Sequence, residues 1–243
     1  MPLLVSLNGS SLDFCPLLSG LYDGHRIVGR TGKVFDNAGA LSTVNNLLQI
    51  RKLMIEQKPR RTLEIGMAFG GSALTFAVSH RDLGHLPAQQ HTAIDPAQSA
   101  YWDDAGRQHL ERAHLDGYVR VIEKYSATAL PELIGEQQRF ELIYVDGSHQ
   151  FEDVLMDFVF CHELLTIGGM ILFDDSTDSQ VAKVLRFIDA NYNEIYERQL
   201  LLRGSRQEQM KRRLACLLRK NQLTAYRKLR DGRQNWGKPL KRF

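Results

Sequence analysis

The sequence lacks any long apolar run. Over its 243 residues, no stretch reaches the ~18 apolar residues that a membrane-spanning helix requires. The first residues, MPLLVSLNGSSLDFCPLL, also lack the basic start that is typical of a secretory signal peptide. We therefore expect no membrane span, and we expect a cytoplasmic protein.

Cysteine is scarce as well. Cys15, Cys161 and Cys216 are far apart, odd in number and outside any CxxC pair. This pattern argues against a zinc site and favours reduced thiols in a cytoplasmic protein.

Acidic residues are almost missing from the C-terminal part of the chain. Residues 198–243 contain 15 Lys and Arg against 2 Asp and Glu, so this segment carries a net charge of +13. The other 197 residues contain 16 basic and 26 acidic side chains, a net charge of −10. A basic tail can attract phosphates, nucleic acid or an anionic membrane surface. A solvated, partly ordered C-terminus is the plainer interpretation, and both stay open.

The sequence does contain short apolar runs that alternate with longer amphipathic segments. The runs have the length and composition of strands buried on both faces, and we expect strands at residues 62–66, 91–95, 118–123, 140–146 and 169–175. The segments between them have helical apolar spacing, and we expect helices at residues 71–80, 103–114, 127–136, 149–165 and 178–190. Strands that alternate with helices predict an α/β fold with a mostly parallel sheet.

One more helix is expected before the first strand, within residues 42–59. Ser42 or Thr43 can cap its start, and the region of Pro59 ends it. The residues before this helix, 1–41, contain many glycine and polar residues, and we expect an irregular arm there.

The end of the chain is ambiguous. Ser205 and Glu208 have the spacing of a capping box, which favours a helix over the following residues. The segment RLACLLRK could equally be a last strand, paired with residues 194–200 in an antiparallel hairpin.

A glycine-rich loop follows the first expected strand, in the segment LEIGMAFGGSALTFA. Gly66 permits a tight turn, and Gly70 and Gly71 let a ligand approach the backbone at the start of a helix, where free N–H groups point outward. Asp95 ends the next strand, 29 residues after Gly66, where a carboxylate can accept hydrogen bonds from ribose hydroxyls. Together these features predict a cofactor that contains adenosine.

The loop does not match the dinucleotide fingerprint GxGxxG, because Ala68 stands at the second glycine position. Glu64 lies two residues before the first glycine, where its charge would repel a pyrophosphate and attract the cationic end of S-adenosylmethionine. A helix start that uses its glycines for packing alone is the alternative.

The order E-x-G-x-x-x-G-x-S, formed by Glu64, Gly66, Gly70 and Ser72, resembles the first motif of class I S-adenosylmethionine-dependent methyltransferases. The similarity is greatest to the small metal-dependent O-methyltransferases, which include catechol O-methyltransferase and macrolide-sugar and antibiotic-tailoring enzymes. It continues through AIDPAQ, YSATALPEL, IYVDGSHQFEDVLMDF and LLTIGGMILFDDS, and covers roughly residues 42–190.

The resemblance implies a doubly wound, Rossmann-like sheet of seven strands in the order 3-2-1-4-5-7-6, with the last strand antiparallel and helices on both faces. It therefore favours residues 194–200 and 213–219 as a closing hairpin. The expected organisation is an irregular arm over 1–41, a methyltransferase domain over 42–220 and a basic extension over 221–243. Relatives of this kind often form dimers, so we expect a homo-oligomer.

The resemblance also assigns residues to the S-adenosylmethionine site. Glu64, Gly66 and Ser72 line its methionine end, Asp95 binds the ribose, and Ser126 borders the adenine. The whole expected set is Glu64, Gly66, Met67, Ala68, Gly70, Ser72, Asp95, Ser126 and Asp146.

Three carboxylates follow the fourth and fifth expected strands. Asp146 ends one strand, and Asp174 and Asp175 end the next, so parallel pairing brings them to one edge of the sheet. Such a cluster repels itself unless a cation lies among its members, and oxygen ligands suit Mg²⁺. The resemblance places the metal of its metal-dependent members on the same three residues. The alternative is that Asp174 and Asp175 cap the next helix.

His149 lies one turn beyond Asp146. An imidazole there can accept the proton of an acceptor hydroxyl that a divalent ion has acidified. The predicted catalytic residues are therefore His149 and Asp146, while Ser148 is expected to cap the following helix. The alternative for His149 is an inert, hydrogen-bonded histidine near the start of that helix.

The leading prediction is a metal-assisted O-methyltransferase that acts on a hydroxylated small molecule or sugar. A nicotinamide-dependent oxidoreductase is disfavoured by Glu64 and by the missing second glycine. An RNA or other nucleic-acid methyltransferase that uses the basic tail is the further alternative.

Overall fold

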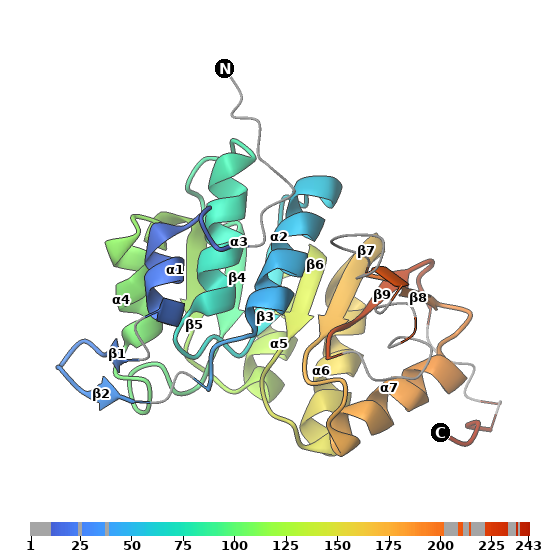
Figure 1. Cartoon of the computed structure of the whole chain (residues 1–243). Coiled ribbons are helices and arrows are strands. Elements are labelled where there is room, and N and C mark those ends of the chain that lie inside the picture. The colour runs from blue at the N-terminus through green and yellow to red at the C-terminus, as the bar shows by residue number, and fades with distance from the viewer. Residues whose placement is uncertain are drawn as a thin grey trace. The chain divides into compact units, whose positions relative to one another are not determined.

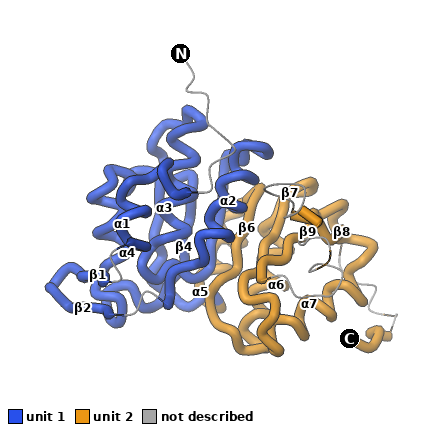
Figure 2. The backbone as a smooth tube through the Cα atoms, in the orientation of Figure 1, with its two compact units in different colours: residues 1–126 blue, residues 127–243 orange. Residues whose placement is uncertain are grey.

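The computed structural model describes residues 11–23, 26–36, 39–201, 209–210, 214, 222–232, 237 and 239–243. The chain divides into two compact units, residues 1–126 and residues 127–243 (Figure 2). Seven strands form one sheet in the order β5-β4-β3-β6-β7-β9-β8 (Figure 1). This is the predicted order, and the last strand, β9, is antiparallel to both of its neighbours. The prediction of a Rossmann-like α/β fold is therefore confirmed.

Unit 1 contains three strands of this sheet, and these strands run parallel to one another. Its elements in chain order are α1 (Pro16–Asp23), β1 (Ile27–Val28), β2 (Val34–Phe35), α2 (Val44–Gln57), β3 (Thr62–Ile65), α3 (Gly71–Asp82), β4 (His91–Ile94), α4 (Ala105–Arg112), the 3-10 helix η1 (Asp116–Tyr118) and β5 (Val119–Ile122).

Helix α2 shows why these local predictions succeed. Thr43 is its N-cap, and the Thr43 side chain accepts a hydrogen bond from the Asn46 backbone N–H at 3.3 Å. The helix buries Leu47, Ile50 and Met54 completely and packs against α3. It ends at Lys58, whose left-handed backbone donates back to the Met54 carbonyl. Capping and apolar spacing are properties of neighbouring residues, so they are visible in the sequence.

Unit 2 contains the other four strands of the sheet. Helix α5 starts at the last residue of unit 1. The elements in chain order are α5 (Ser126–Gly135), β6 (Phe140–Val145), α6 (Phe151–Leu164), β7 (Leu165–Phe173), α7 (Ser179–Asn191), β8 (Tyr196–Gln199) and β9 (Thr224–Lys228). Strands β6 and β7 are parallel, and the hairpin of β9 and β8 closes the sheet.

The second strand of that hairpin corrects the prediction. It is β9, at residues 224–228, whereas a strand at residues 213–219 was expected. The sheet therefore extends into the segment that was expected to be a basic extension. Leu214 is helical, while the rest of residues 213–219 lies outside the described residues, as does the predicted capping box.

Burial explains why the sequence does not predict this strand. Lys228 is only 2% exposed, and its ammonium donates to the backbone carbonyls of His162 and Leu165 at 2.8 Å and pairs with Asp231 at 2.7 Å. A buried lysine held by partners far away in the chain has no local signature.

The N-terminal arm also differs from the expectation of irregular structure. Helix α1 buries Leu18 and Leu21, and strands β1 and β2 form a two-stranded antiparallel sheet. The Asp103 carboxylate holds this hairpin by accepting hydrogen bonds from the backbone N–H groups of Thr31 and Lys33, at 2.9 and 3.3 Å. The order of this arm depends on a partner about 70 residues away, which local sequence cannot reveal.

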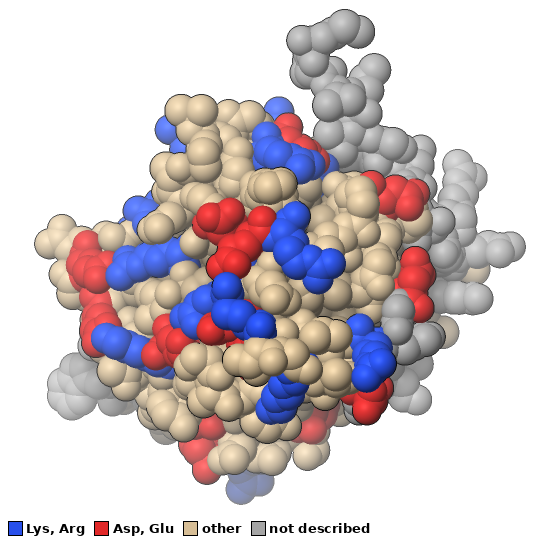
Figure 3. Space-filling view, turned by 90° about the vertical axis from the view of Figure 1, so that its left-hand side faces the viewer, with Lys and Arg blue, Asp and Glu red and all other residues tan. Residues whose placement is uncertain are grey.

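Surface charges of both signs lie side by side on the face drawn in Figure 3. Unit 1 carries several such pairs, including Arg30 with Glu111 at 2.6 Å and Arg107 with Glu123 at 2.9 Å. Within the described part of the chain, no helix is long and apolar enough to cross a bilayer.

Candidate functional site

The glycine loop of unit 1 joins β3 to α3. Gly66 and Gly70 have φ angles of 89° and 82°, a left-handed conformation that favours glycine. Ala68 also has a positive φ, 44°, although it carries a Cβ. Ala68 stands at the second glycine position of the dinucleotide fingerprint. It therefore adopts a backbone conformation that a glycine at this position would favour.

Asp95 holds this loop in place. Its Oδ2 accepts hydrogen bonds from the backbone N–H groups of Met67 and Ala68, at 3.1 and 2.7 Å, and its Oδ1 accepts one from Ala97 at 2.8 Å. The carboxylate is only 3% exposed. In this conformation the predicted ribose-binding residue is engaged by the loop itself.

Two residues that the sequence analysis missed complete the support of the loop. The side-chain amide of Gln98 donates to the Ala68 carbonyl at 2.7 Å and to Asp95 Oδ2 at 3.1 Å. Gly106 of α4 lies so close that an added Cβ would stand 2.7 Å from the Ala68 carbonyl oxygen. Gln98 lies only three residues after Asp95, so the sequence gives a weak indication that it supports the loop. Nothing in the sequence near the loop indicates the close approach of Gly106.

Glu64 is completely buried and is the last residue but one of β3, two positions before Gly66 of the loop. Burial raises the pKa of its carboxyl to about 8; the nearby Ser72 hydroxyl lowers it in part, and the Asp95 charge raises it. Neither carboxyl oxygen makes a hydrogen bond of normal geometry. His91 Nε2 lies 3.3 Å from Glu64 Oε1 and is likewise without a hydrogen-bond partner.

Two further predicted cofactor residues lie at helix starts. Ser72 is buried in the first turn of α3, and Ser126 is the first residue of α5 and half-buried. Of the predicted cofactor residues, all but Asp146 belong to unit 1.

The carboxylate cluster belongs to unit 2. Asp146 directly follows β6, and Asp174 and Asp175 directly follow the parallel strand β7. The Tyr144 hydroxyl donates to Asp146 Oδ2 at 3.0 Å and also contacts Asp174 Oδ2. Asp174 Oδ1 accepts from the Asp175 backbone N–H at 2.7 Å, and Asp174 is only 5% exposed. Tyr144, which the sequence analysis did not single out, therefore joins two of the three carboxylates.

His149 lies beside Asp175, a half-buried member of the cluster. Its Nε2 is 3.0 Å from Asp175 Oδ2, and the Gln222 side chain donates to Asp175 Oδ1 at 3.2 Å. Ligand atoms of Asp146, His149 and Asp175 all lie within 4.8 Å of one another. Asp175 has a φ of 45°, so a non-glycine residue is held in a left-handed conformation here.

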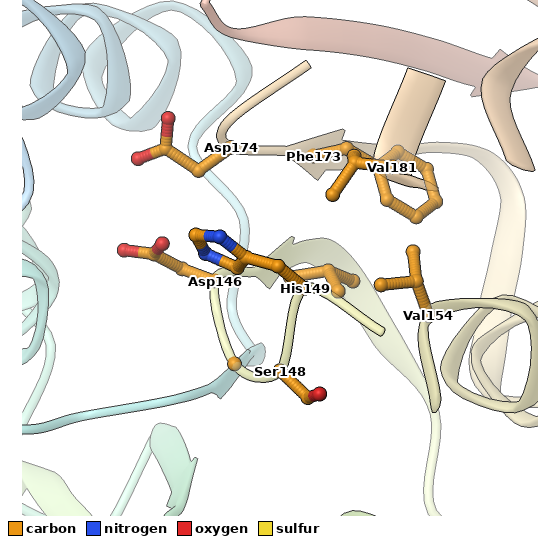
Figure 4. A pocket seen from close by; sticks show the side chains of 9 residues that line it. Asp146, Ser148, His149, Val154, Phe173, Asp174 and Val181 are labelled. Atoms are coloured by element: carbon orange, nitrogen blue, oxygen red, sulfur yellow. The ribbon is translucent and has the colours of Figure 1, made fainter. Parts of the chain in front are cut away.

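These side chains border a small hollow of unit 2 (Figure 4). The carboxylates of Asp146 and Asp174 and the His149 imidazole gather on one side, while Phe173 and Val181 lie on the other. The residues that line it are Val145, Asp146, Gly147, Ser148, His149, Val154, Phe173, Asp174 and Val181.

Local geometry corrects two predictions in this region. Helix α6 begins at Phe151, so His149 lies in the loop before it and not in its first turn. Ser148 is not the cap, because Gln150 is the N-cap, and the Ser148 hydroxyl accepts from the Gln150 N–H at 3.2 Å. The chain turns at Ser148, and the helix begins at Phe151, two residues later than predicted.

The alternative role of Asp174 and Asp175 as helix caps does not hold. The N-cap of α7 is Asp178, whose side chain accepts from the Gln180 N–H at 2.9 Å. Both earlier aspartates therefore remain with the cluster that includes Asp146.

Comparisons with known proteins agree with this architecture. Residues 63–176 match the family model described as a methyltransferase domain. The chain is 26% identical over 168 residues to a rhamnosyl O-methyltransferase of Mycobacterium leprae, covering 65% of this chain and 68% of that protein. It is 27% identical over 126 residues to a caffeoyl-CoA O-methyltransferase of Stellaria longipes, covering 49% of this chain and 47% of that protein. This match confirms the predicted resemblance to methyltransferases.

A solved structure shows the same fold. The O-methyltransferase TomG of Streptomyces achromogenes, involved in tomaymycin synthesis and solved with S-adenosylmethionine, superposes with a TM-score of 0.63 at 18% identity, covering 88% of this chain and 89% of that one. The chain spans about half the length of several curated relatives that it matches, such as the Stellaria enzyme.

Proposed function

We propose that this protein is an S-adenosylmethionine-dependent O-methyltransferase that methylates a hydroxyl group of a small molecule or sugar. The observation that carries the proposal is the methyltransferase match over residues 63–176, which includes both the glycine loop and the carboxylate cluster. The named relatives, a rhamnosyl and a caffeoyl-CoA O-methyltransferase, support oxygen as the methylated atom.

Unit 1 provides the residues for the methyl donor. S-adenosylmethionine supplies a methyl group on a positively charged sulfur and also carries a cationic amino group. The buried Glu64 carboxyl has no hydrogen-bond partner of normal geometry, so it is a suitable partner for a cation at the loop. Gly66, Gly70 and Ser72 form the turn and the helix start that let a ligand approach the backbone.

The ribose contact is proposed for Asp95 on different grounds. Its carboxylate already accepts bonds from Met67, Ala68 and Gln98, so it shapes the loop whether or not a ligand is bound. Each carboxylate oxygen can accept more than one hydrogen bond, and ribose hydroxyls would use that remaining capacity.

Unit 2 provides the residues for the acceptor. The carboxylate oxygens of Asp146 and Asp175 lie close enough to share a hard divalent ion such as Mg²⁺, and they leave positions for other ligands. Asp174, the third predicted ligand, is held beside Asp146 by the Tyr144 hydroxyl. A divalent ion, when bound, would lower the pKa of the acceptor hydroxyl and fix its orientation. Tyr144 orients two of these carboxylates through its hydroxyl.

His149 is the proposed base. Its Nε2 faces Asp175, which leaves Nδ1 to accept the hydroxyl proton, and Asp175 would then stabilise the imidazolium. The bound cofactor would supply its methyl group to the acceptor oxygen and leave as S-adenosylhomocysteine, and His149 would hold the proton that the acceptor hydroxyl loses.

Calorimetry with S-adenosylmethionine and with NAD tests the cofactor, and transfer of a labelled methyl group to a panel of sugars and phenols tests the reaction. We expect binding of S-adenosylmethionine, no binding of NAD, and label in a base-stable ether of one acceptor class. Tight binding of NAD without binding of S-adenosylmethionine would contradict the proposal.

A further inference from the structure

Five polar side chains of unit 1 form a continuous chain that starts at Glu64. Glu64 Oε1 lies 3.3 Å from His91 Nε2, and His91 Nδ1 lies 2.8 Å from Thr62 Oγ1. The same hydroxyl is 2.9 Å from His80 Nε2, and His80 Nδ1 is 2.9 Å from His85 Nδ1. The first four residues are 0% exposed, whereas His85 is half-buried in the loop after α3. The chain therefore links a buried carboxyl to the protein surface.

The contacts in this chain have two self-consistent arrangements of protons. With Glu64 protonated, its O–H faces His91 Nε2, His91 donates from Nδ1 to Thr62, Thr62 donates to His80 Nε2, and His80 donates from Nδ1 to His85. His85 then carries its own proton on Nε2.

With Glu64 ionised, every contact reverses. His85 donates from Nδ1 to His80, His80 donates from Nε2 to Thr62, Thr62 donates to His91 Nδ1, and the His91 Nε2–H faces the carboxylate. The proton that His85 held on Nε2 has passed to water. The two arrangements differ by one proton, and all three imidazoles are neutral in both.

The surroundings favour neutral imidazoles. Burial lowers the pKa of His91 to about 3, and burial together with the neighbouring His91 and His85 lowers that of His80 to about 3. The Phe76 ring stacks on His91 with centroids 4.4 Å apart, which holds the imidazole plane. Within unit 1, the charged and polar groups that bear on Glu64 are His91 and Asp95 from the β4 side and Ser72 from α3.

We propose that the row of side chains from Glu64 to His85 carries the proton of Glu64 to solvent when a cationic ligand binds at the glycine loop, so that binding releases one proton. The inference rests on the proposed function, because S-adenosylmethionine would bring the positive charge that favours an ionised carboxyl. The O–H bond of Glu64 breaks, N–H and O–H bonds shift by one position along the chain, and His85 loses its Nε2 proton to water. His91, Thr62, His80 and His85 are positioning residues that act through Glu64.

Equilibrium measurements test the proton release. Calorimetric titration of the wild type with S-adenosylmethionine in phosphate and in Tris gives the number of protons released, and Glu64→Gln corrects for protons exchanged by the ligand itself. At pH 7 we expect the wild type to release nearly one proton more than Glu64→Gln on binding. This difference should fall toward zero as the pH rises above about 8. Infrared difference spectra should show the loss of a protonated carboxyl band on binding, absent in Glu64→Gln.

Kinetic measurements test the route. Thr62→Val removes the hydroxyl at the centre of the row. His85→Phe removes the imidazole that passes the proton to water, and because His85 is only half-buried this variant is less prone to misfold. Proton release, followed with an indicator dye in a stopped-flow instrument, should slow by about tenfold in both, the change that follows from one lost hydrogen bond of ~1.4 kcal/mol. Thr75→Val is the matched control, since Thr75 is equally buried but bonds the Gly71 carbonyl at 3.0 Å.

Binding itself can be followed in the same experiment. Trp102 lies 4.9 Å from Phe69 of the glycine loop, ring centroid to ring centroid, and Trp236→Phe leaves it as the single tryptophan of the chain. Binding with equal proton release in wild type and Glu64→Gln would overturn the relay and leave the proposed function standing. Equal release rates in wild type, Thr62→Val and His85→Phe would overturn the route. Absence of any binding of S-adenosylmethionine to the wild type would overturn the proposed function and the relay together.

Discussion

Each unit of the protein places a carboxyl group next to a histidine at the end of a strand, but in opposite environments. In unit 1, Glu64 and His91 lie 3.3 Å apart and both side chains are 0% exposed. In unit 2, Asp175 and His149 lie 3.0 Å apart with 35% and 47% of their side chains exposed. The same pair of residue types therefore has different chemistry available in the two places.

Burial decides the difference. A charge without water is costly, so the Glu64 carboxyl holds its proton to about pH 8 while His91 stays neutral to about pH 3. Glu64 can pass its proton to His91 while His91 passes on another, so the interior never holds a carboxylate and an imidazolium together. The more exposed pair in unit 2 keeps contact with water and lies near Asp146, as the proposed cation and acceptor require.

The largest expected effect tests the carboxylate cluster of unit 2. Asp146→Ala should lower turnover on the order of 10³-fold, because it removes a proposed ligand to an ion that contributes several kcal/mol to the barrier. Calorimetry should show that S-adenosylmethionine still binds. Glu152→Gln, an exposed acid in the first turn of α6, is the control and should leave turnover near the wild-type value. Wild-type activity unaffected by EDTA would contradict the role of the cluster.

The next effect tests the buried pair through stability. The folded-state pKa of Glu64 is raised from 4.5 to about 8, so the unfolded state ionises first and the free energy of unfolding falls as the pH rises through this window. Glu64→Gln should lack this fall, so its stability relative to the wild type should increase on the order of 4 kcal/mol between pH 4.5 and pH 8.

Urea unfolding of both ligand-free proteins at several pH values measures that difference. The lowered pKa values of His80 and His91 act in the opposite direction, since the stability that they contribute is lost as the pH falls from 6.5 toward about 3. They are present in both proteins and cancel to first approximation. Parallel curves for wild type and variant would show that Glu64 does not titrate in this range.

His149→Ala should reduce turnover by about 10²-fold, the usual contribution of a general base. Added imidazole should restore part of the activity, and Ser148→Ala is the neighbouring control. Metal titration of the variant separates two roles: unchanged metal affinity supports the base, whereas a large loss would make His149 a nitrogen ligand of the ion.

The smallest effect tests the support of the glycine loop. Gly106→Ala puts a Cβ within 3 Å of the Ala68 carbonyl oxygen and the Gln98 side chain, so the loop must shift. We expect affinity for S-adenosylmethionine to fall about tenfold, as for a loss of ~1.4 kcal/mol. Gly20→Ala in α1 meets no atom within 4 Å and serves as the matched control. Equal affinities in the two variants would show that the packing of α4 does not position the loop.

Much of the fold is determined by local sequence. The apolar run at residues 62–66 predicts β3, Thr43 caps α2 as expected, and the apolar spacing of residues 178–190 predicts α7. These features depend on side chains a few positions apart, so the sequence carries them directly. The carboxylates after β6 and β7 were predicted in the same way, because parallel strands bring their ends to one edge.

Tertiary structure decided the rest. The strand at residues 224–228 is stabilised by a buried lysine that donates to two backbone carbonyls more than 60 residues earlier in the chain. The helix near His149 begins two residues later than predicted. Glu64, Thr62, His80, His85 and His91 look unrelated in the sequence. Only the parallel pairing of β3 with β4 and the packing of α3 on both bring these five side chains into one row, each within 3.3 Å of the next, and burial then sets the protonation of Glu64, His80 and His91.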